Sequence, residues 1–377
     1  MSLVKNIKEN IYDEIKRRPY KAGEKLPGVR ELAKLYEVSY VTMSNALLML
    51  AQEGIIEQFP GKGSFVTDMV SKNSLALFVP DYFLGLKTYD PATDSTCLFG
   101  LMDIYSGILA SVQKEKFNLH IIPIPSENMD VEKYYKLIMD KLNVSGAFFM
   151  SVNASGLIDR LSKANCPCCK LHTPGDPKYN YVAVDIEKGA YNIVKHLIKL
   201  GHKRVALISG GGDEKNIWFK GRYKGYYKAL NKAKIKPRSE FIQMIDSHTV
   251  DDDILTERVD KLLALPESPT AIFVSSDVWA LHIIKILQDK GVNVPGDVSV
   301  AGFDDYVESK VFDPPLTTVA QPFYQIGQRA FVVMKRLLLE PSERVCSIIE
   351  PNLIIRKSTA QPRKSKMKKV KELCMKE

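Results

Sequence analysis

The fold of this chain is decided by residues 22–66, which read AGEKLPGVRELAKLYEVSYVTMSNALLMLAQEGIIEQFPGKGSFV. The apolar spacing predicts a short helix over 29–36 and a longer helix over 40–54, with Ser39 placed to cap the second helix. Two short helices joined by a tight turn form a helix-turn-helix pattern. Two short apolar runs separated by PGKG follow, and they predict a β-hairpin wing.

Apolar residues also predict a helix before this stretch and a buried face within it. Ile7, Ile11 and Ile15 recur at helical spacing and stop before Pro19, which does not continue a helix. In the helix over 40–54, the residues expected to face inward are Ala46, Leu47, Leu50 and Ala51. The first part of the chain is therefore expected to be a small helical domain with a wing.

The rest of the chain alternates apolar strand-like runs with helical stretches. The runs begin with LALFVP at 75–80, and the rhythm continues through AIFVSSD at 271–277 to VSVAGFDD at 298–305. Strands that alternate with helices predict parallel sheets. Two such series in one chain favour an α/β architecture of two doubly wound subdomains, with a ligand cleft at the carboxyl ends of their strands.

The net charge of +9 is concentrated at the C-terminus. Residues 1–70 carry ten basic and nine acidic residues, whereas residues 356–377 carry nine basic residues and only two acidic ones. Basicity is therefore a property of the tail. Any argument for DNA binding must rest on the helix-turn-helix pattern itself.

Cysteine usage favours free thiols over a disulfide framework, because the six cysteines are sparse and unevenly spaced. Cys166 and Cys169 form a CxxC, which leaves redox chemistry or half a metal site as alternatives. No second CxxC or HxxxH completes four ligands, so small apolar residues on a buried strand are the favoured interpretation and no metal is expected.

The chain offers no sign of export or of membrane insertion. Its first eight residues carry polar and charged groups where a signal peptide needs an apolar run, and no stretch approaches the roughly 18 apolar residues of a membrane span. A cytoplasmic protein without a membrane partner is expected.

Residues 22–66 resemble the winged helix-turn-helix of the GntR family over essentially its whole length. The resemblance implies DNA contacts from one arginine before the turn, from the start of the third helix and from the wing. The inherited positions are Arg30, Ser39, Tyr40, Thr42, Ser44, Asn45, Lys62 and Gly63. Many relatives carry several arginines on the recognition helix, where this chain has Tyr40, Met43, Ser44 and Asn45, so the operator sequence cannot be transferred.

The roles suit the residue types. A helix N-terminus in the major groove brings short polar side chains to base edges, where Asn45 is suited to bond an adenine. Lys62 and the backbone amides of the wing suit phosphates. The alternative for each of these residues is an ordinary solvated helix or hairpin face.

The second half resembles the effector domain of the LacI/GalR repressors, which is itself similar to periplasmic sugar-binding proteins. The motifs that carry the resemblance are HLIKLGHKRVALISG (196–210), GRYKGYYKAL (221–230), AIFVSSDVWAL (271–281), GVNVPGDVSVAGFDD (291–305) and PPLTTVAQPFYQIGQRA (314–330). A GntR-type domain joined to a LacI-type sensor resembles the arabinose repressors of Gram-positive bacteria. That resemblance implies a sugar effector.

The resemblance also implies a sugar site, whose expected members are Arg222, Asp304, Phe323, Trp218, Ser276, His172 and Asp81. Arginine and aspartate bind adjacent sugar hydroxyls through paired hydrogen bonds, and an aromatic ring covers the apolar face of a sugar. Ser276 stands where relatives often have Asn, and His172 where they often have Asp. The alternatives are a surface ion pair for Arg222, a cap or loop acceptor for Asp304, and core packing for Trp218 and Phe323.

The expected domains follow from these resemblances. They are a DNA-binding domain over 1–67, a linker over 68–74, an effector domain over 75–360 and a basic tail over 361–377. Within the effector domain, the first subdomain is expected to take about 75–182 and 323–345, and the second about 183–322 and 346–360. Residues 82–98 look like an insertion, because the resemblance is weak there.

The function expected from the resemblance is a homodimeric transcription repressor that binds operator DNA and a monosaccharide, with a pentose or 6-deoxyhexose such as arabinose or fucose favoured. A sugar-metabolising enzyme with a DNA-binding appendage is the alternative, but no nucleophile–base pair or metal set supports catalytic residues. Glycines 210–212 lack the GxxxxGK[ST] pattern of a phosphate loop, so no cofactor is expected. A transport binding protein does not agree with the DNA-binding segment.

Overall fold

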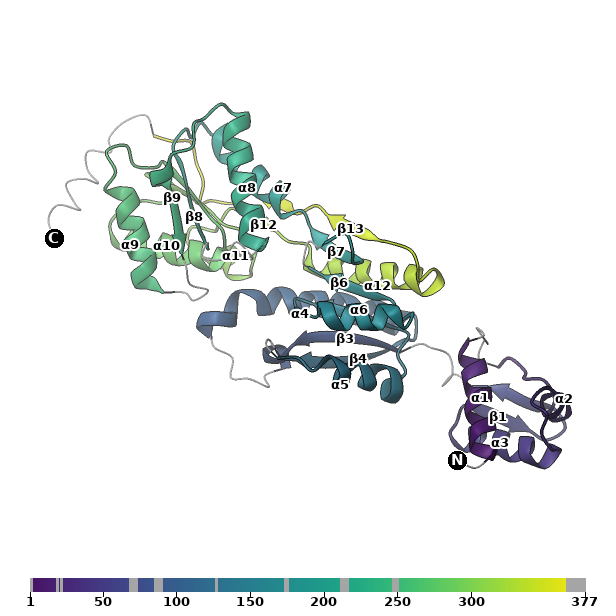
Figure 1. Ribbon diagram of the computed structural model, residues 1–377. Coiled ribbons are helices and arrows are strands. Elements are labelled where there is room, and N and C mark those ends of the chain that lie inside the picture. The colour runs from purple at the N-terminus through teal and green to yellow at the C-terminus, as the bar shows by residue number, and fades with distance from the viewer. Residues whose placement is uncertain are drawn as a thin grey trace. The chain divides into compact units, whose positions relative to one another are not determined.

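The computed structural model describes residues 3–17, 20, 23–67, 74–84, 91–125, 128–172, 176–210, 217–245 and 251–363 (Figure 1). The chain divides into two compact units. One comprises 1–74 with 136–145, and the other comprises 75–135 with 146–377. No helix in the described ranges is both long and apolar enough to cross a membrane.

The N-terminal residues fold as a winged helix, as the sequence predicts. Its elements are α1 (Leu3–Arg17), α2 (Val29–Leu35), α3 (Tyr40–Gln52), β1 (Ile56–Phe59) and β2 (Gly63–Val66). The two strands pair antiparallel, with Ile56 opposite Val66. Residues 23–26 lie along β2 as a third segment, and the amide of Leu26 donates to the carbonyl of Ser64 at 2.9 Å.

The core of this domain comes from the face that the periodicity predicts. Ile7, Ile11 and Ile15 on α1 are buried against Leu47 and Leu50 on α3 in one hydrophobic cluster. The amide of Gly28 donates to Glu31 Oε2 at 2.9 Å, which begins α2 with the reciprocal half of a capping box. The helix-turn-helix therefore stands on a complete small core.

The larger unit contains a six-stranded sheet in the order β13-β7-β6-β5-β3-β4. Its strands are β3 (Ser74–Pro80), β4 (Asn118–Ile124), β5 (Gly146–Met150), β6 (Cys168–Leu171), β7 (Tyr181–Val184) and β13 (Cys346–Ile349). The pairings from β13 through β7, β6 and β5 to β3 are parallel. The accompanying helices are η1 (Asp81–Leu84), α4 (Pro91–Lys114), α5 (Val131–Lys136), α6 (Ser155–Lys163) and α12 (Phe323–Leu339). The π-helical turn η2 (Leu137–Leu142) falls in the range 136–145 that groups with the first unit.

A second, four-stranded parallel sheet has the order β11-β10-β8-β9. Its strands are β8 (Val205–Gly210), β9 (Ile242–Ile245), β10 (Ala271–Val274) and β11 (Ser299–Ala301). Its helices are α7 (Ile186–Lys199), α8 (Ile217–Lys232), η3 (Ser239–Phe241), α9 (Asp252–Leu263), α10 (Asp277–Asp289) and α11 (Glu308–Val311). A short antiparallel pair, β12 (Thr318–Ala320) with β14 (Asn352–Ile354), completes the unit.

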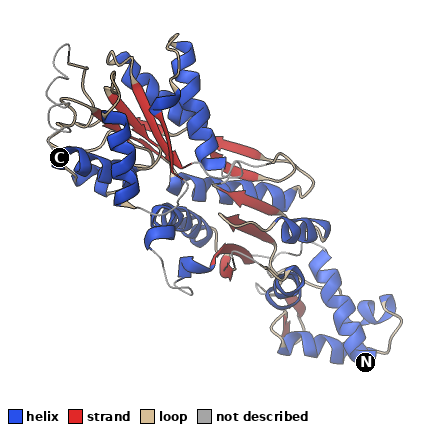
Figure 2. Cartoon of the chain, turned by 60° about the vertical axis from the view of Figure 1, so that its left-hand side comes forward, coloured by secondary structure: helices blue, strands red, loops and turns tan. Residues whose placement is uncertain are grey.

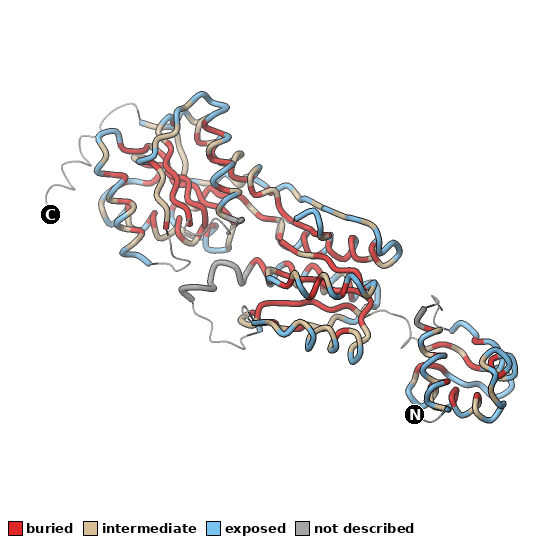
Figure 3. Tube along the Cα trace, viewed as in Figure 1, coloured by how far each residue is buried: buried red, intermediate tan, exposed pale blue. Residues whose placement is uncertain are grey.

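Both faces of the four-stranded sheet are covered. Ala271 and Phe273 of β10 belong to one hydrophobic cluster, whereas Ile272 and Val274 belong to another. Alternate side chains of a strand point to opposite faces, so a strand buried on both faces is apolar throughout. Figure 2 shows helices beside the strands of both sheets, and Figure 3 shows that most of the central strands are buried.

The structure departs from the expected domains and elements at two points. β7 crosses the expected subdomain limit at 182/183, and β13 lies in the range expected for the second subdomain, but both strands belong to the six-stranded sheet of the first. β9, formed by IQMI, was not predicted, because four half-buried residues carry little periodic signal. Most of the expected insertion at 82–98 lies outside the residues whose side chains are described.

Candidate functional site

The residues predicted to contact DNA are largely exposed on α2, α3 and the wing. Arg30, Tyr40, Asn45, Lys62 and Gly63 are exposed. Thr42 and Ser44 are half-buried on the first turns of α3. Met43 differs from these neighbours because it is fully buried in the core, so this residue of the recognition helix faces away from any ligand.

Ser39 has a structural role in addition to its exposed position. Its hydroxyl accepts a hydrogen bond from the amide of Thr42 at 3.1 Å and lies 2.8 Å from the Thr42 hydroxyl, so it caps α3 as the sequence predicts. The cap fixes the helix N-terminus whose amides and short side chains would approach a base edge.

The wing adds a cation that sequence reasoning missed. Gly63 adopts φ +109°, and a Cβ at this position would lie 2.9 Å from Lys25 Cε. Lys25 is exposed and forms an isolated antiparallel bridge with Phe65, so its side chain lies beside the wing glycine. The AGEKLPG motif contains this lysine, but only the pairing of residues 23–26 with β2 brings it to the wing.

Four of the predicted sugar contacts meet Gln321 in the larger unit, and we call this group the effector cluster: Arg222, Asp304, Gln321, His172 and Phe323. Arg222 Nη2 donates to Asp304 Oδ1 at 2.7 Å. Gln321 Nε2 donates to the same oxygen at 2.7 Å, and Gln321 Oε1 lies 3.1 Å from His172 Nε2. The rings of His172 and Phe323 meet edge to face at 5.1 Å. All five side chains are buried.

The cluster draws on both sheets of the unit. Arg222 lies on α8, and Asp304 follows β11 of the four-stranded sheet. His172 follows β6 of the six-stranded sheet, and Phe323 begins α12. Both loop residues therefore lie at carboxyl ends of parallel strands, which is where α/β folds bind their ligands.

Burial controls the protonation of the cluster. Burial raises the pKa of Asp304 to about 7, although the Arg222 guanidinium and the Gln321 amide both favour the carboxylate. Burial lowers the pKa of His172 to about 4, so its imidazole is neutral at physiological pH. The Arg222 guanidinium also lies 4.5 Å from the centre of the Phe303 ring, and its Nε has no hydrogen-bond partner among the described residues.

The backbone holds two cluster members in unusual conformations. Asp304 has φ 127° and His172 has φ 67°, and Asp305 follows with φ 62°. Positive φ is uncommon for residues other than glycine and is often retained at functional sites, where the surrounding structure must hold it.

The other predicted sugar contacts lie in several environments. Ser276 is buried at the N-terminus of α10, and its hydroxyl helps lower the pKa of Asp304 without forming a hydrogen bond of normal geometry. The carboxylate of Asp81 accepts from the amide of Tyr82 at 3.0 Å, just after β3. The side chain of Trp218 lies outside the described residues.

Gln321 is the member of the cluster that sequence reasoning missed. It stands in PLTTVAQPF two residues before the predicted Phe323, within a motif already singled out. The motif marks the segment, but only the three-dimensional structure shows that this amide links Asp304 to His172.

The cysteines of the CxxC are free thiols beside or on β6. Cys166, Cys168 and Cys169 are all buried, and burial raises the pKa of Cys168 and Cys169. A buried thiol with a raised pKa is a poor nucleophile and a poor metal ligand. No group of potential metal ligands is present among the described residues.

Comparison with known proteins agrees with both parts of the fold. Residues 3–66 match the model for bacterial regulatory proteins of the gntR family, and residues 194–359 match the periplasmic binding protein-like domain. The HTH-type transcriptional repressor PurR of Vibrio atlanticus (strain LGP32) is 34% identical over 268 residues, which cover 70% of this chain and 78% of that protein. The chain belongs to the LacI-type family of transcriptional regulators.

Further relatives of this LacI-type regulator point the same way. Catabolite control protein A of Priestia megaterium is 35% identical over 225 residues. These residues cover 59% of this chain and 66% of that relative's length. A solved LacI family regulator of Enterococcus faecium with bound ribose has a TM-score of 0.60 and 21% identity, and it covers 77% of this chain and 100% of its own. These relatives are named as regulators of transcription rather than as enzymes. The N-terminal match to the gntR family identifies the DNA-binding part of this LacI-type regulator as a winged helix.

Proposed function

We propose that this chain is a cytoplasmic transcription repressor of a sugar-utilisation operon, whose affinity for operator DNA is modulated by a monosaccharide bound at the effector cluster. The observation that carries the proposal is the buried group of Arg222, Asp304 and Gln321 beside Phe323. A guanidinium, a carboxylate and an amide bind hydroxyl pairs, and an aromatic ring covers a sugar's apolar face.

The position of the cluster supports modulation by ligand. Its members come from loops and helices of both sheets, so a sugar that joins them favours one arrangement of the two subdomains over others. A ligand with such a preference shifts the population of the DNA-binding state, and operator DNA must change sugar affinity by the same factor. Typical coupling free energies are about 1–3 kcal/mol.

The proposed assembly is a homodimer through the effector domain. One winged helix covers one half-site, and a two-fold operator presents half-sites about 34–36 Å apart or a multiple of that spacing. Two copies are therefore required for a palindromic operator. A strictly monomeric species on such an operator would contradict this part of the proposal.

The favoured sugar is a pentose or a 6-deoxyhexose such as arabinose or fucose. The resemblance to arabinose repressors supports this choice, and the ribose bound to the Enterococcus faecium regulator adds a pentose to the candidates. Ser276 and His172 stand where relatives often carry Asn and Asp, so these two positions should govern which sugar fits.

The proposal is tested in two steps with the full chain. Operators are first selected from a random DNA pool, and monosaccharides are then screened by thermal shift and by their effect on operator binding in fluorescence anisotropy. Saturable binding of one sugar that weakens operator binding, without product formation, is the expected result. Turnover of the sugar, or binding of sugar and DNA with no effect on each other, would reject the proposal.

A further inference from the structure

The turn that carries Asp304 into the effector cluster is conformationally strained. Asp304 and Asp305 have φ values of 127° and 62°, and neither is a glycine. The turn follows β11 and leads into α11. Two consecutive residues of this kind cost free energy, so neighbouring groups must hold the turn.

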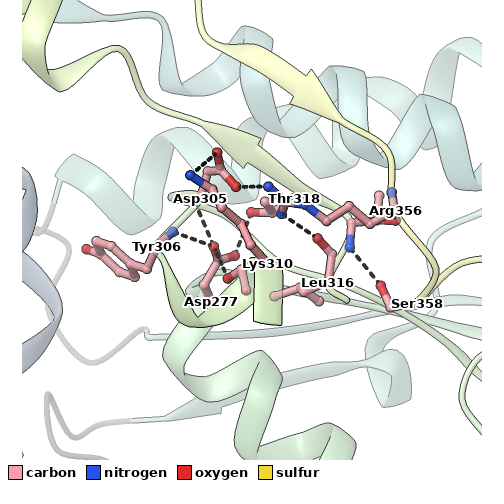
Figure 4. A network of polar contacts seen from close by, with 10 residues as sticks. Asp277, Asp305, Tyr306, Lys310, Leu316, Thr318, Arg356 and Ser358 are labelled. Atoms are coloured by element: carbon pink, nitrogen blue, oxygen red, sulfur yellow. Dashed lines mark hydrogen bonds and ion pairs between the residues drawn. The ribbon is translucent and has the colours of Figure 1, made fainter. Parts of the chain in front are cut away.

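Asp277 is the group placed to hold it. Asp277 is the first residue of α10, and its side chain is fully buried. Its Oδ2 accepts hydrogen bonds from the amides of Asp305 at 2.7 Å and Tyr306 at 3.2 Å, and from the hydroxyl of Ser309 at 2.8 Å. Figure 4 shows the Asp277 carboxylate directly below the turn.

The other oxygen of Asp277 is bonded to β12. Oδ1 accepts from the hydroxyl of Thr318, on β12, at 2.5 Å. The amide of Asp277 itself donates to the carbonyl of Phe303 at 2.9 Å, directly before the turn. Asp277 therefore joins three segments: the start of α10, the strained turn and β12.

A carboxylate is the chemical group that this arrangement requires. Successive backbone amides in a turn of this kind form a concavity that binds an anion. An Asn side chain offers one oxygen in place of two, and its NH₂ group would face either the amides or the Thr318 hydroxyl. The opposite flank of the turn is held by Arg356, which donates to Asp305 Oδ1 at 2.5 Å and to the carbonyl of Leu316 at 2.8 Å (Figure 4).

We propose that Asp277 is a positioning residue of the effector site: its carboxylate fixes the strained turn at 304–306 and thereby aims the Asp304 carboxylate at Arg222 and Gln321. The inference rests on the proposed function in one respect, namely that the effector cluster binds sugar. Among the hydrogen bonds of the described residues, none joins Asp277 to Arg222 or Gln321. The negative charge of Asp277 also raises the pKa of Asp304, and amide exchange of the turn separates the hold on the backbone from this effect of charge.

The test compares Asp277→Asn with Asp289→Asn, an exposed residue at the other end of α10 whose carboxylate pairs with Lys285 at 2.7 Å. Amide hydrogen exchange of Asp305 and Tyr306 is measured in the full-length protein without ligand. Exchange should rise at least tenfold in Asp277→Asn and stay unchanged in Asp289→Asn. Unchanged exchange in Asp277→Asn would overturn the proposed hold on the turn.

Sugar affinity is then measured by calorimetry with D-ribose and L-arabinose in a double-mutant cycle with Asp304→Asn. Asp277→Asn should weaken binding by about 5- to 150-fold in the otherwise unchanged protein, which is equivalent to about 1–3 kcal/mol. In the Asp304→Asn background, the loss of sugar affinity caused by Asp277→Asn should be at least fivefold smaller, because position 304 no longer carries the carboxylate that the turn orients. Equal losses in both backgrounds would show a general structural role and overturn the proposal.

Two further outcomes are a variant that does not fold and a protein that binds neither sugar. If Asp277→Asn does not fold, Ser309→Ala replaces it, because this change removes one hydrogen-bond donor to Asp277 Oδ2 and leaves the carboxylate. Sugar affinity should then fall two- to fivefold, and only in proteins that keep Asp304. Unchanged sugar affinity would contradict the proposal. If neither sugar binds the unchanged protein, the proposed sugar class fails, and the amide exchange still decides whether Asp277 holds the turn.

Discussion

At the scale of single residues, Arg222 lies buried between Asp304 and the Phe303 ring, inside the larger unit and outside the DNA-binding domain. Arg222→Ala should therefore keep operator binding and lose the response to sugar. Charge-assisted hydrogen bonds contribute roughly 1.5–3 kcal/mol each, so the loss of two would weaken sugar affinity by about two to four decades. Calorimetry paired with operator anisotropy measures both quantities.

The buried ion pair adds a stability effect that must be separated from this loss. Removal of Arg222 leaves Asp304 buried without its cation, which destabilises the fold. Arg222→Ala combined with Asp304→Asn should recover part of the thermal stability and none of the sugar affinity. Arg238→Ala, which breaks an exposed pair with Glu267, is the matched control. Unchanged sugar affinity in Arg222→Ala would place the sugar elsewhere.

Asp304 also predicts how sugar affinity depends on pH. The pKa of Asp304 is about 7, so the ionised carboxylate, which accepts hydrogen bonds, is lost as the pH falls below that value. Sugar that bonds to the carboxylate should bind about tenfold more weakly for each pH unit below 7, and affinity should level off above it. His172, with a pKa of about 4, stays neutral across this range. Calorimetry from pH 5.5 to 8.5 should show a flat profile for Asp304→Asn; a slope that persists in this variant would assign the titration to another group.

At the scale of elements, α3 and the wing should divide specificity from general affinity. Asn45→Ala should change base preference in an operator selection, because Asn45 is exposed on α3, the helix that we propose enters the major groove. Arg30→Ala and Lys62→Ala should weaken binding to all sequences and reduce the salt slope by about 1 each.

Met43→Ala separates recognition from folding on the same helix. Met43 is fully buried, so its truncation should destabilise the winged helix by about 2–5 kcal/mol while base preference stays the same. An unchanged operator selection for Asn45→Ala would show that this residue contacts solvent or phosphate instead of a base.

The same elements show what the sequence could and could not predict. Long periodic segments such as α1, α7 and α10 and caps such as Ser39 carry local signals, so their existence and type could be predicted. β12 and β14 have three residues each, too few for a periodic pattern, and only their antiparallel pairing defines them. Gln321 and Asp277 take their roles from partners 17 to 149 positions away in the sequence, which no local pattern encodes.

At the scale of the whole molecule, the proposed function requires the two units to keep separate chemistries. The residues proposed to face DNA are mostly exposed polar and basic groups on α2, α3 and the wing, whereas the effector cluster is buried and contains an internal ion pair. DNA binding should therefore respond to salt, and sugar binding should respond weakly, because exposed charges are screened and buried pairs are not.

Removal of the basic tail should affect DNA binding and leave sugar binding unchanged. Removal of residues 364–377 deletes six lysines and two glutamates and lowers the net charge from +9 to +5. The cut leaves Arg363 in place, which pairs with Asp297 at 3.3 Å. The truncated protein should bind D-ribose or L-arabinose as the full chain does, within about twofold, since the effector cluster contains no tail residue. Its affinity for non-specific DNA and the salt slope of that binding should both fall, because fewer lysines release counterions from phosphates. Calorimetry and anisotropy over 50–200 mM salt measure the two effects, and a truncation that abolished sugar binding would show that the tail takes part in the effector domain.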